Sequence, residues 1–230
     1  MKTYAWAIIM ALGIAIGGYF IYSGICNFAE KDRCVTVKGL SEREVLANRV
    51  TWPMSVALEG NNLEGVCNEI ARKQKAIVKF LTDNKIKEDD IFVNNPNISD
   101  RWEYGYEDAI KNNKARYKVT ADVTVTSRDV PHIMKLMQNQ EALLKQGVCV
   151  STEDYRVQYD YVDLTNIKPE MVEEATKDAR KVAEKFAEDA DCKLGSIMSA
   201  TQGQFTIESQ YYRPQYKQIR VVTTISYYLK

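Results

Sequence analysis

The segment from Met171 to Ile197 constrains the fold more than any other part of the chain. Its apolar residues recur at steps of three and four, the period of a helix with one apolar face. Pro169 suits the first turn of this helix, and Gly195 marks its expected end. A helix of this length extends about 30 Å, so its apolar stripe requires a sheet of similar width. The predicted stripe consists of Val172, Ala175, Ala179, Val182, Ala183, Phe186 and Ala190.

The remaining sequence supplies strands and two further helices. Helical spacing predicts helices over 63–84 and 130–146, the second capped by Asp129 and ended by Gly147. Pro53 donates no backbone hydrogen bond, which indicates a sheet edge or a bulge. The long helices should each cover one face of largely antiparallel strands, which is an α+β fold. Alternation of apolar and polar residues predicts the strands 34–39, 50–59, 91–98, 117–126, 148–162, 197–207 and 216–229.

The order of these elements repeats along the chain. Residues 45–127 read strand, helix, strand, strand, and residues 148–229 read the same way. We therefore hypothesise that one domain, 34–230, contains duplicated β-α-β-β halves, 34–147 and 148–230. With 230 residues and 45% hydrophobic content, the chain is long enough for one large core or two small ones.

The first 33 residues differ from the rest in composition. No charged residue lies between Lys2 and Glu30, and the nearly apolar stretch 4–25 is long enough to span a bilayer. We expect a transmembrane helix that anchors the chain in the cytoplasmic membrane. A cleaved signal is the alternative, although Asn27-Phe28-Ala29 is a poor cleavage site. Gly13 and Gly17 form a GxxxG pattern, which permits close packing of two membrane helices.

The sequence offers no set of residues typical of an active site. Lys plus Arg and Asp plus Glu both number 31, so no basic excess indicates nucleic acid as a partner. The single histidine, His132, is expected on the surface, and no nucleophile motif accompanies it. Clustered zinc ligands and glycine-rich phosphate loops are missing from the sequence. We therefore predict no catalytic residues, no metal site, no cofactor and no enzymatic activity.

Two chemical alternatives stay open. The acidic pairs Asp89-Asp90, Glu153-Asp154 and Glu173-Glu174 could serve a glycosidase, which needs two facing carboxylates. The five cysteines are widely spaced and odd in number, so no disulfide framework can be assigned. Redox protection is the second alternative. It would involve Cys34, Cys149 or Cys192.

Aromatic residues gather in turn-rich segments. The chain has 14 tyrosines, and aromatic side chains are enriched at interaction surfaces. We predict a contact surface on these segments, although a rim of exposed rings without a role is the simpler interpretation. The predicted surface consists of Trp102, Tyr104, Tyr106, Tyr211, Tyr212 and Tyr216.

Three segments carry a resemblance to a known family. The sequences VTVKG at 35–39, VTVTSRDV at 123–130 and ATKDARKVAEKFAEDADCKLGSI at 175–197 resemble successive signatures of the SIMPL-domain family. The family often has glycine before the turn where Asp191 and Cys192 stand here. The resemblance implies an exported or periplasmic α+β domain that self-assembles, without an established enzymatic activity, and with a link to oxidative stress in some members.

Together these observations predict a non-enzymatic envelope protein. The domain 34–230 would lie in the periplasm, form homo-oligomers and bind a further envelope protein that is not identified. The alternative function is a small-ligand or glycan-binding module that uses the aromatic loops around Trp102 and Tyr211.

Overall fold

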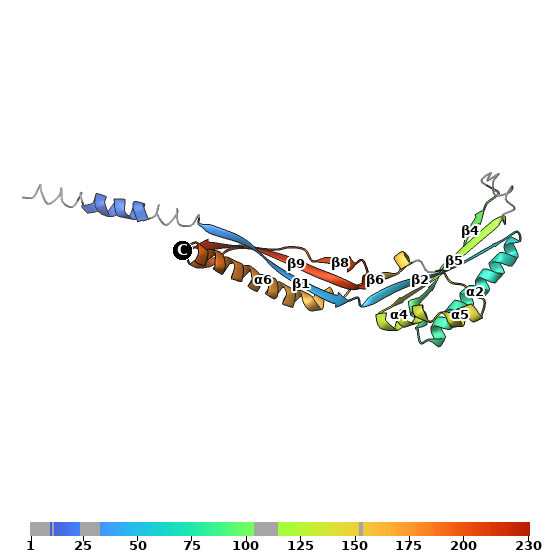
Figure 1. The fold of residues 1–230 in the computed structure, drawn as a ribbon. Helices are drawn as coiled ribbons and strands as arrows, with labels where there is room; N and C mark the ends of the chain where they lie inside the picture. Colours follow the sequence, from blue (N-terminus) through green and yellow to red (C-terminus); the bar gives the residue numbers. More distant parts are fainter. Residues whose placement is uncertain (1–9, 11, 24–32, 104–114, 152–153) are drawn as a thin grey trace, which may run out of the picture. The chain divides into compact units, whose positions relative to one another are not determined.

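The computed structural model describes residues 10, 12–23, 33–103, 115–151 and 154–230 (Figure 1). Contacts divide the chain into two units. Unit 1 comprises residues 1–44, 164–208 and 218–230, and unit 2 comprises residues 45–163 and 209–217. Both units combine antiparallel strands with helices, which confirms the predicted α+β class. The proposed halves 34–147 and 148–230 follow element order along the chain, and their duplication stays a hypothesis.

Two long strands form the middle of the sheet of unit 2. Strand β2 (Arg49–Gly60) pairs with β5 (Tyr117–Ser127) in an unbroken antiparallel register. The strands beside them are short, and Pro96 separates the two strands that replace the predicted strand 91–98. These short strands are β3 (Ile91–Val93), β4 (Asn97–Asp100) and β6 (Gln158–Asp160).

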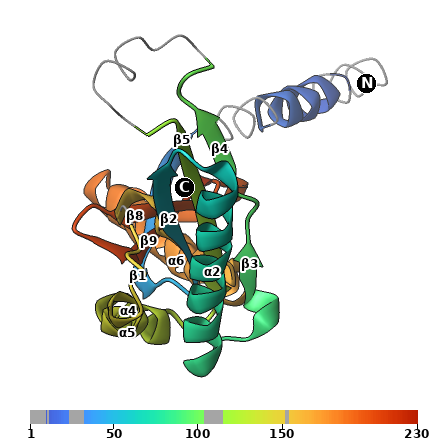
Figure 2. The same ribbon diagram turned by 90° about the vertical axis from the view of Figure 1, so that its right-hand side faces the viewer.

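Helix α2 (Leu63–Asp83) lies along one face of β2 and β5 (Figure 2). It begins after Asn62, whose side chain accepts a hydrogen bond from the Gly65 N–H at 3.2 Å. The predicted helix 130–146 is instead two helices, α4 (Val130–Gln138) and α5 (Glu141–Lys145). The break turns Leu143 into the core and leaves Leu144 58% exposed.

Pro53 lies in a central strand, which corrects the expected edge position. On the side away from β5, Ser55 exchanges two backbone hydrogen bonds with Ser151, at 3.1 and 2.8 Å. Backbone groups two residues apart on a strand point to the same side, so the missing N–H of Pro53 faces this outer side as well. Strand β6 pairs only with residues 49–51, and the gap before Ser55 accommodates the proline.

The predicted strand 148–162 is largely wrong. Only β6 lies within it, together with the short 3-10 helix η2 (Asp154–Arg156) and an isolated bridge at Ser151. Tyr155, within the predicted strand, is 81% exposed. A second 3-10 helix, η1 (Glu88–Asp90), precedes β3.

Most of the other sheet belongs to unit 1. Strand β9 (Arg213–Leu229) lies between β1 (Cys34–Leu46) and β7 (Leu194–Gln202), and β8 (Thr206–Gln210) also pairs with β9. The Leu229 N–H donates to the Arg33 carbonyl at 2.9 Å, and the hydroxyls of Thr36 and Ser226 are 2.8 Å apart. Strands β1 and β9 therefore run in opposite directions.

Helix α6 (Leu164–Asp189) covers one face of this sheet. It differs from the predicted helix in two ways. It begins before Pro169, which lies inside the helix and not in its first turn. Phe186, assigned to the apolar stripe, is 58% exposed. The buried stripe repeats every fourth residue and consists of Met171, Ala175, Ala179, Ala183 and Ala187.

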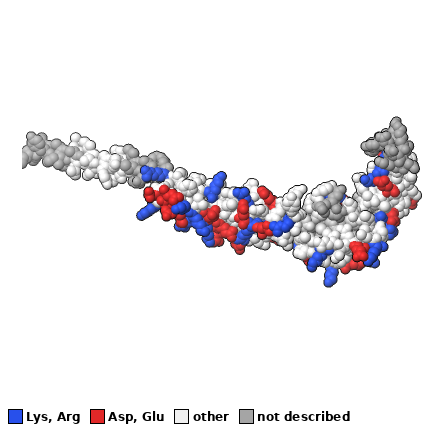
Figure 3. Space-filling view, in the orientation of Figure 1, with Lys and Arg blue, Asp and Glu red and all other residues white. Residues whose placement is uncertain are grey.

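The alanines let α6 approach β1 closely. A Cβ added at Gly39 would lie 1.9 Å from the Ala175 carbonyl oxygen and 2.4 Å from the Ala179 nitrogen. The outer side of the helix carries ion pairs, including Lys177 with Glu173 at 2.5 Å and Arg180 with Glu184 at 2.9 Å. Figure 3 shows charges of both signs interspersed over α6, which is typical of a solvated helix face.

Residues 12–23 of the N-terminal segment are helical. A Cβ added at Gly13 or Gly17 would meet no atom within 4 Å. Among the described residues, no helix has both the length and the apolar character that crossing a membrane requires.

Candidate functional site

Strand β7 forms an outer edge of the sheet in unit 1. It pairs with β9 from Ser199↔Ser226 to Gln202↔Thr223, and the Gly203 N–H donates to the Val222 carbonyl at 2.8 Å. Because backbone direction alternates along a strand, the N–H and C=O groups of Ala200 and Gln202 point away from β9. These outward groups can accept a further strand.

The edge carries apolar side chains and no charge. No charged residue occurs from Leu194 to Ile207. Ile197 is 54% exposed, Met198 53% and Ile207 41%. Natural proteins usually guard long edges with charges, proline or a covering element. The pairing of β7 with β9 shifts register twice between Leu194 and Ser199, and such irregularity discourages a further strand at this part of the edge. The last four residues of β7 pair with β9 in a regular register.

The other edges of the described sheets are guarded. On β1, the outward N–H of Leu40 donates to Asp178 Oδ2 of α6 at 3.0 Å. Arg43 of the same strand donates to Glu170 Oε2 at 2.7 Å and also pairs with Glu174. In unit 2, the edge strands β3, β4 and β6 have three or four residues each. The described part of the chain therefore leaves β7 as its one long, uncharged edge.

The predicted aromatic surface separates into two clusters in unit 2. Trp102 is 44% exposed and stacks with the Arg116 guanidinium, 5.4 Å from the ring centre. Tyr211 and Tyr212, in the turn between β8 and β9, are 89% and 91% exposed, with ring centres 5.0 Å apart. Tyr216 is half-buried, and Arg213 lies 4.7 Å from its ring centre. Tyr104 and Tyr106 lie outside the described residues.

Two cavities of unit 2 lie elsewhere. One is at the end of α2 and the other along its flank, beside Val78 and Val93. Neither of these two is lined by Trp102 or by the tyrosines of the predicted surface. The aromatic rings therefore contribute to neither cavity.

Three of the residues considered for catalysis, His132, Glu173 and Glu174, have ordinary structural partners, and Glu153 lies outside the described residues. His132 is half-buried, contrary to the expected exposed position, and its Nε2 lies 2.9 Å from the Asn84 carbonyl oxygen. Glu173 pairs with Lys177, and Glu174 accepts from Ser41 at 2.7 Å. Within the described ranges, no three His, Cys, Asp or Glu side chains are grouped as metal ligands.

The tightest polar cluster of unit 2 lies on the sheet face opposite α2. Ser55 donates to Asp122 Oδ1, and Arg156 donates to both the Ser55 hydroxyl and Asp122 Oδ2, the latter at 2.6 Å. Burial alone would raise the pKa of Asp122, but hydrogen bonds from Arg156 and Ser55 outweigh it and lower the pKa below the ordinary 3.8. A carboxylate with a lowered pKa is a weak base, so this cluster is suited to holding η2 and not to activating Ser55.

The variant Arg156→Met should lose about 1–3 kcal/mol of unfolding free energy at pH 7, because it leaves Asp122 partly buried without its charged partner. Because the pKa of Asp122 is lower in the folded chain than in the unfolded chain, its ionised form stabilises the fold at pH values above the unfolded pKa. This contribution disappears as the pH falls through the folded pKa. The difference from wild type should therefore shrink below about pH 4. Urea denaturation at pH 7 and pH 3.5 measures it.

Arg128→Met is the matched control for this prediction. Arg128 pairs with Asp163 at 3.3 Å, and its side chain is 72% exposed. Exposed pairs contribute less than about 1 kcal/mol. Equal losses in the two variants would contradict the structural role assigned to Arg156.

The cysteines in the described residues are all free. Cys34 and Cys149 are exposed, whereas Cys67 and Cys192 are half-buried. The redox alternative stays a prediction.

A family model matches most of the chain. The family model described as "SIMPL: Protein of unknown function (DUF541)" matches residues 35–224. No curated protein matches the sequence. The match spans strands and helices of both units.

Proposed function

Because the chain belongs to the SIMPL family, whose model covers residues 35–224, we propose that it is a non-enzymatic scaffold that self-assembles. Residues 4–25 anchor it in the cytoplasmic membrane, and the SIMPL domain lies in the periplasm. Two copies join through strand β7, so that two sheets become one. The link to oxidative stress that the resemblance implies stays a prediction.

The observation that carries this proposal is the exposed, uncharged edge of β7. Pairing along an edge supplies main-chain hydrogen bonds, and the alternating side chains then pack against those of the partner. Ile197, Met198 and Ile207 would contribute apolar area to such a contact. A second copy is a suitable partner, because closed homo-oligomers built on twofold contacts are the commonest assemblies.

Exposure of Tyr211 and Tyr212 favours a second candidate function, binding of a glycan or of another envelope protein. Their edge-to-face pair is a typical hot-spot arrangement. Loss of binding to isolated cell-wall glycan in the double variant Tyr211→Ser, Tyr212→Ser would support it. Binding equal to wild type would remove it.

Ala200→Pro tests the assembly directly. Proline removes the outward N–H of this residue and leaves the pairing of β7 with β9 intact, since that N–H faces away from β9. Each copy loses a hydrogen bond of about 1 kcal/mol across the contact, so we expect association to weaken about 10-fold or more. Light scattering of the full chain in detergent micelles should then give the mass of one 26.3 kDa chain.

Ala200→Thr is the control, because threonine keeps the N–H and favours strands. It should assemble as wild type does. Wild-type chain that is monomeric at micromolar concentration would refute self-assembly. An assembled Ala200→Pro variant would instead refute the role of β7.

A further inference from the structure

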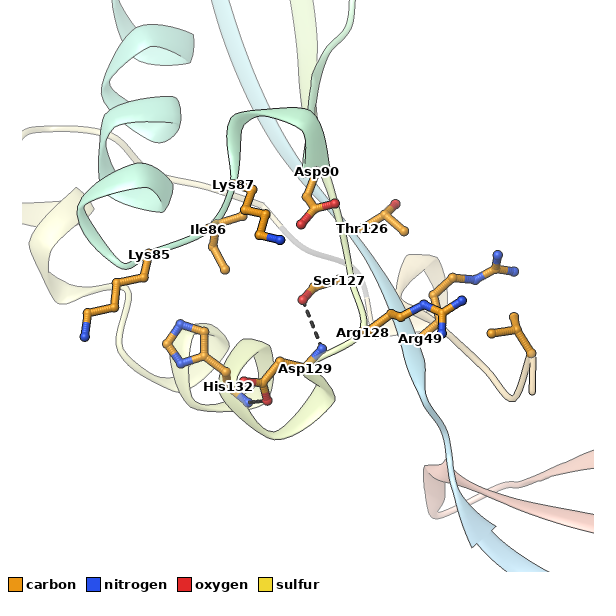
Figure 4. A pocket seen from close by; sticks show the side chains of 11 residues that line it. Arg49, Lys85, Ile86, Lys87, Asp90, Thr126, Ser127, Arg128, Asp129 and His132 are labelled. Carbon is orange, nitrogen blue, oxygen red and sulfur yellow. Dashed lines mark hydrogen bonds between the residues drawn. The ribbon is translucent and has the colours of Figure 1, made fainter. Parts of the chain in front are cut away.

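A cavity of about 570 Å³ opens in unit 2 between the end of α2 and the start of α4 (Figure 4). One wall is the turn that holds Lys85 and Lys87, and the other is the end of β5 with Asp129 and His132. The volume is typical of small-molecule sites. Residues from both walls are held in place by contacts within unit 2.

The turn after α2 is a Schellman motif with lysine at the position where glycine is usual. The Lys85 N–H donates to the Thr82 carbonyl at 2.9 Å, and the Ile86 N–H donates to the Leu81 carbonyl at 3.1 Å. Ile86 is 7% exposed and belongs to the core, which fixes the lysines on either side of it. Lys85 has a φ of 67°, a conformation that costs a residue with a Cβ about 1–2 kcal/mol.

Strained backbone of this kind is concentrated at functional sites. Glycine would adopt this φ without cost. Figure 4 shows the Lys85 side chain directed away from Lys87, at the rim of the cavity.

The opposite wall is a chain of hydrogen bonds. The Ser127 hydroxyl accepts from the Asp129 N–H at 3.1 Å, and Asp129 Oδ1 accepts from the His132 N–H at 3.1 Å. His132 Nε2 must carry the hydrogen shared with Asn84, because a carbonyl oxygen only accepts. The Ser127 hydroxyl keeps its own hydrogen for a ligand, since its bond to Asp129 uses only the oxygen.

Some of the charged side chains that line the cavity form ion pairs with other described residues, and others do not. Arg49 pairs with Asp160 at 2.9 Å, and Arg128 pairs with Asp163 at 3.3 Å. Lys85 and Lys87 have no ion-pair partner among the residues that the structure describes. Figure 4 shows the Lys87 side chain directed toward the space between the walls, beside Asp90 from the same turn.

We propose that this cavity binds a small hydroxylated anion. Its phosphate or carboxylate group lies against Lys87, whose side chain points into the space between the walls (Figure 4), where a charge-assisted hydrogen bond is strong. Its hydroxyl groups donate to the Asp90 carboxylate and accept from Ser127. A ligand with a single anionic group and several hydroxyls satisfies both signs of charge in the lining. The site is independent of assembly through β7.

Isothermal titration calorimetry of the full chain in detergent micelles tests the proposal with four probes. We expect saturable binding of glucose 6-phosphate or gluconate, at least 10-fold tighter than that of glucose or inorganic phosphate. Lys87→Gln should weaken this binding about 10-fold or more, the loss of one charged hydrogen bond. Lys118→Gln, an exposed lysine of β5 outside the cavity, should leave it unchanged.

Lys85→Gly separates binding from folding. Removal of the backbone strain should offset the entropy that glycine gains in the unfolded chain, so Tm should stay within about 2–4 °C of wild type. Binding should keep most of its affinity, because the Lys85 side chain points away from Lys87 (Figure 4). Failure of all four probes to bind saturably at millimolar concentration would overturn the proposal. So would equal effects of Lys87→Gln and Lys118→Gln, or a loss of affinity in Lys85→Gly as large as that in Lys87→Gln.

Discussion

Gly39→Ala is expected to cost about 3 kcal/mol or more of unfolding free energy in unit 1, at or beyond the upper end of ordinary overpacking. The added Cβ would lie 1.9 Å from the Ala175 carbonyl oxygen and 2.8 Å from the Ala179 Cβ. Both neighbours belong to the α6 backbone or to a side chain without rotamers. The whole helix must therefore shift away from β1, which also disturbs the Leu40 to Asp178 hydrogen bond.

Hydrogen exchange read by mass spectrometry checks this result locally. Exchange over 164–189 should become much faster, whereas α2 in unit 2 should keep its protection. Gly65→Ala is the matched control, because the nearest atom to its added Cβ is Asn62 Cγ at 3.6 Å, an ordinary contact. It should be neutral or stabilising by about 0.5–1 kcal/mol. If Gly39→Ala behaves like Gly65→Ala, the close packing of α6 on β1 is wrong.

Trp52→Ala is expected to cost unit 2 about 3–5 kcal/mol, the usual loss for a large buried aromatic side chain. Trp52 has no exposed surface and lies opposite Val125 in the centre of the sheet, beneath the helices. Its removal leaves a cavity at the middle of the core that contains Met54 and Ile77. Urea denaturation should show the loss, with faster exchange in α2 and unchanged exchange in α6.

Trp102→Ala provides the comparison for the same side chain outside the core. Trp102 is 44% exposed, and its aromatic face contacts Arg116. A cation–π contact at an exposed site is worth about 0.5–1 kcal/mol, so this variant should lose no more than about 1 kcal/mol. A comparable loss in both tryptophan variants would contradict the assigned core.

The sequence predicts those elements whose local signals agree with their surroundings. Helix α2 has a turn and a cap at Asn62, a regular apolar period and an end at Asp83, and it was predicted within one residue. Strand β5 alternates without interruption and was predicted equally well. In both, the buried face is the one that carries the large apolar residues.

The prediction errors arise where close packing between elements, and not the size of the apolar side chains, decides which residues are buried. In α6 the sheet approaches so closely at Gly39 that alanines face it, and the larger Phe186 lies outside. Gly195 looked like a helix stop, but it lies within β7, where an added Cβ would be 2.7 Å from the Tyr228 carbonyl oxygen. Such close approaches depend on a partner strand that is distant in sequence.

The candidate sites were missed for a related reason. Strand β7 was predicted in part, but its position at the edge follows from the pairing order of the sheet and not from its own residues. The absence of charge from 194 to 207 was the available signal. At the cavity, the left-handed backbone of Lys85 has no counterpart in composition or spacing, and a lysine after a helix is otherwise an ordinary residue.

The placement of β9 between β1 and β7 sets the sequence of events during biosynthesis. When β1 has left the ribosome, its partner β9 is still to be translated, about 180 codons later by the separation of Cys34 and Arg213. Most of unit 2 is contained in one continuous segment and can fold meanwhile. The first part of unit 1 must therefore wait as an open nascent chain until β9 has been made and its sheet can close.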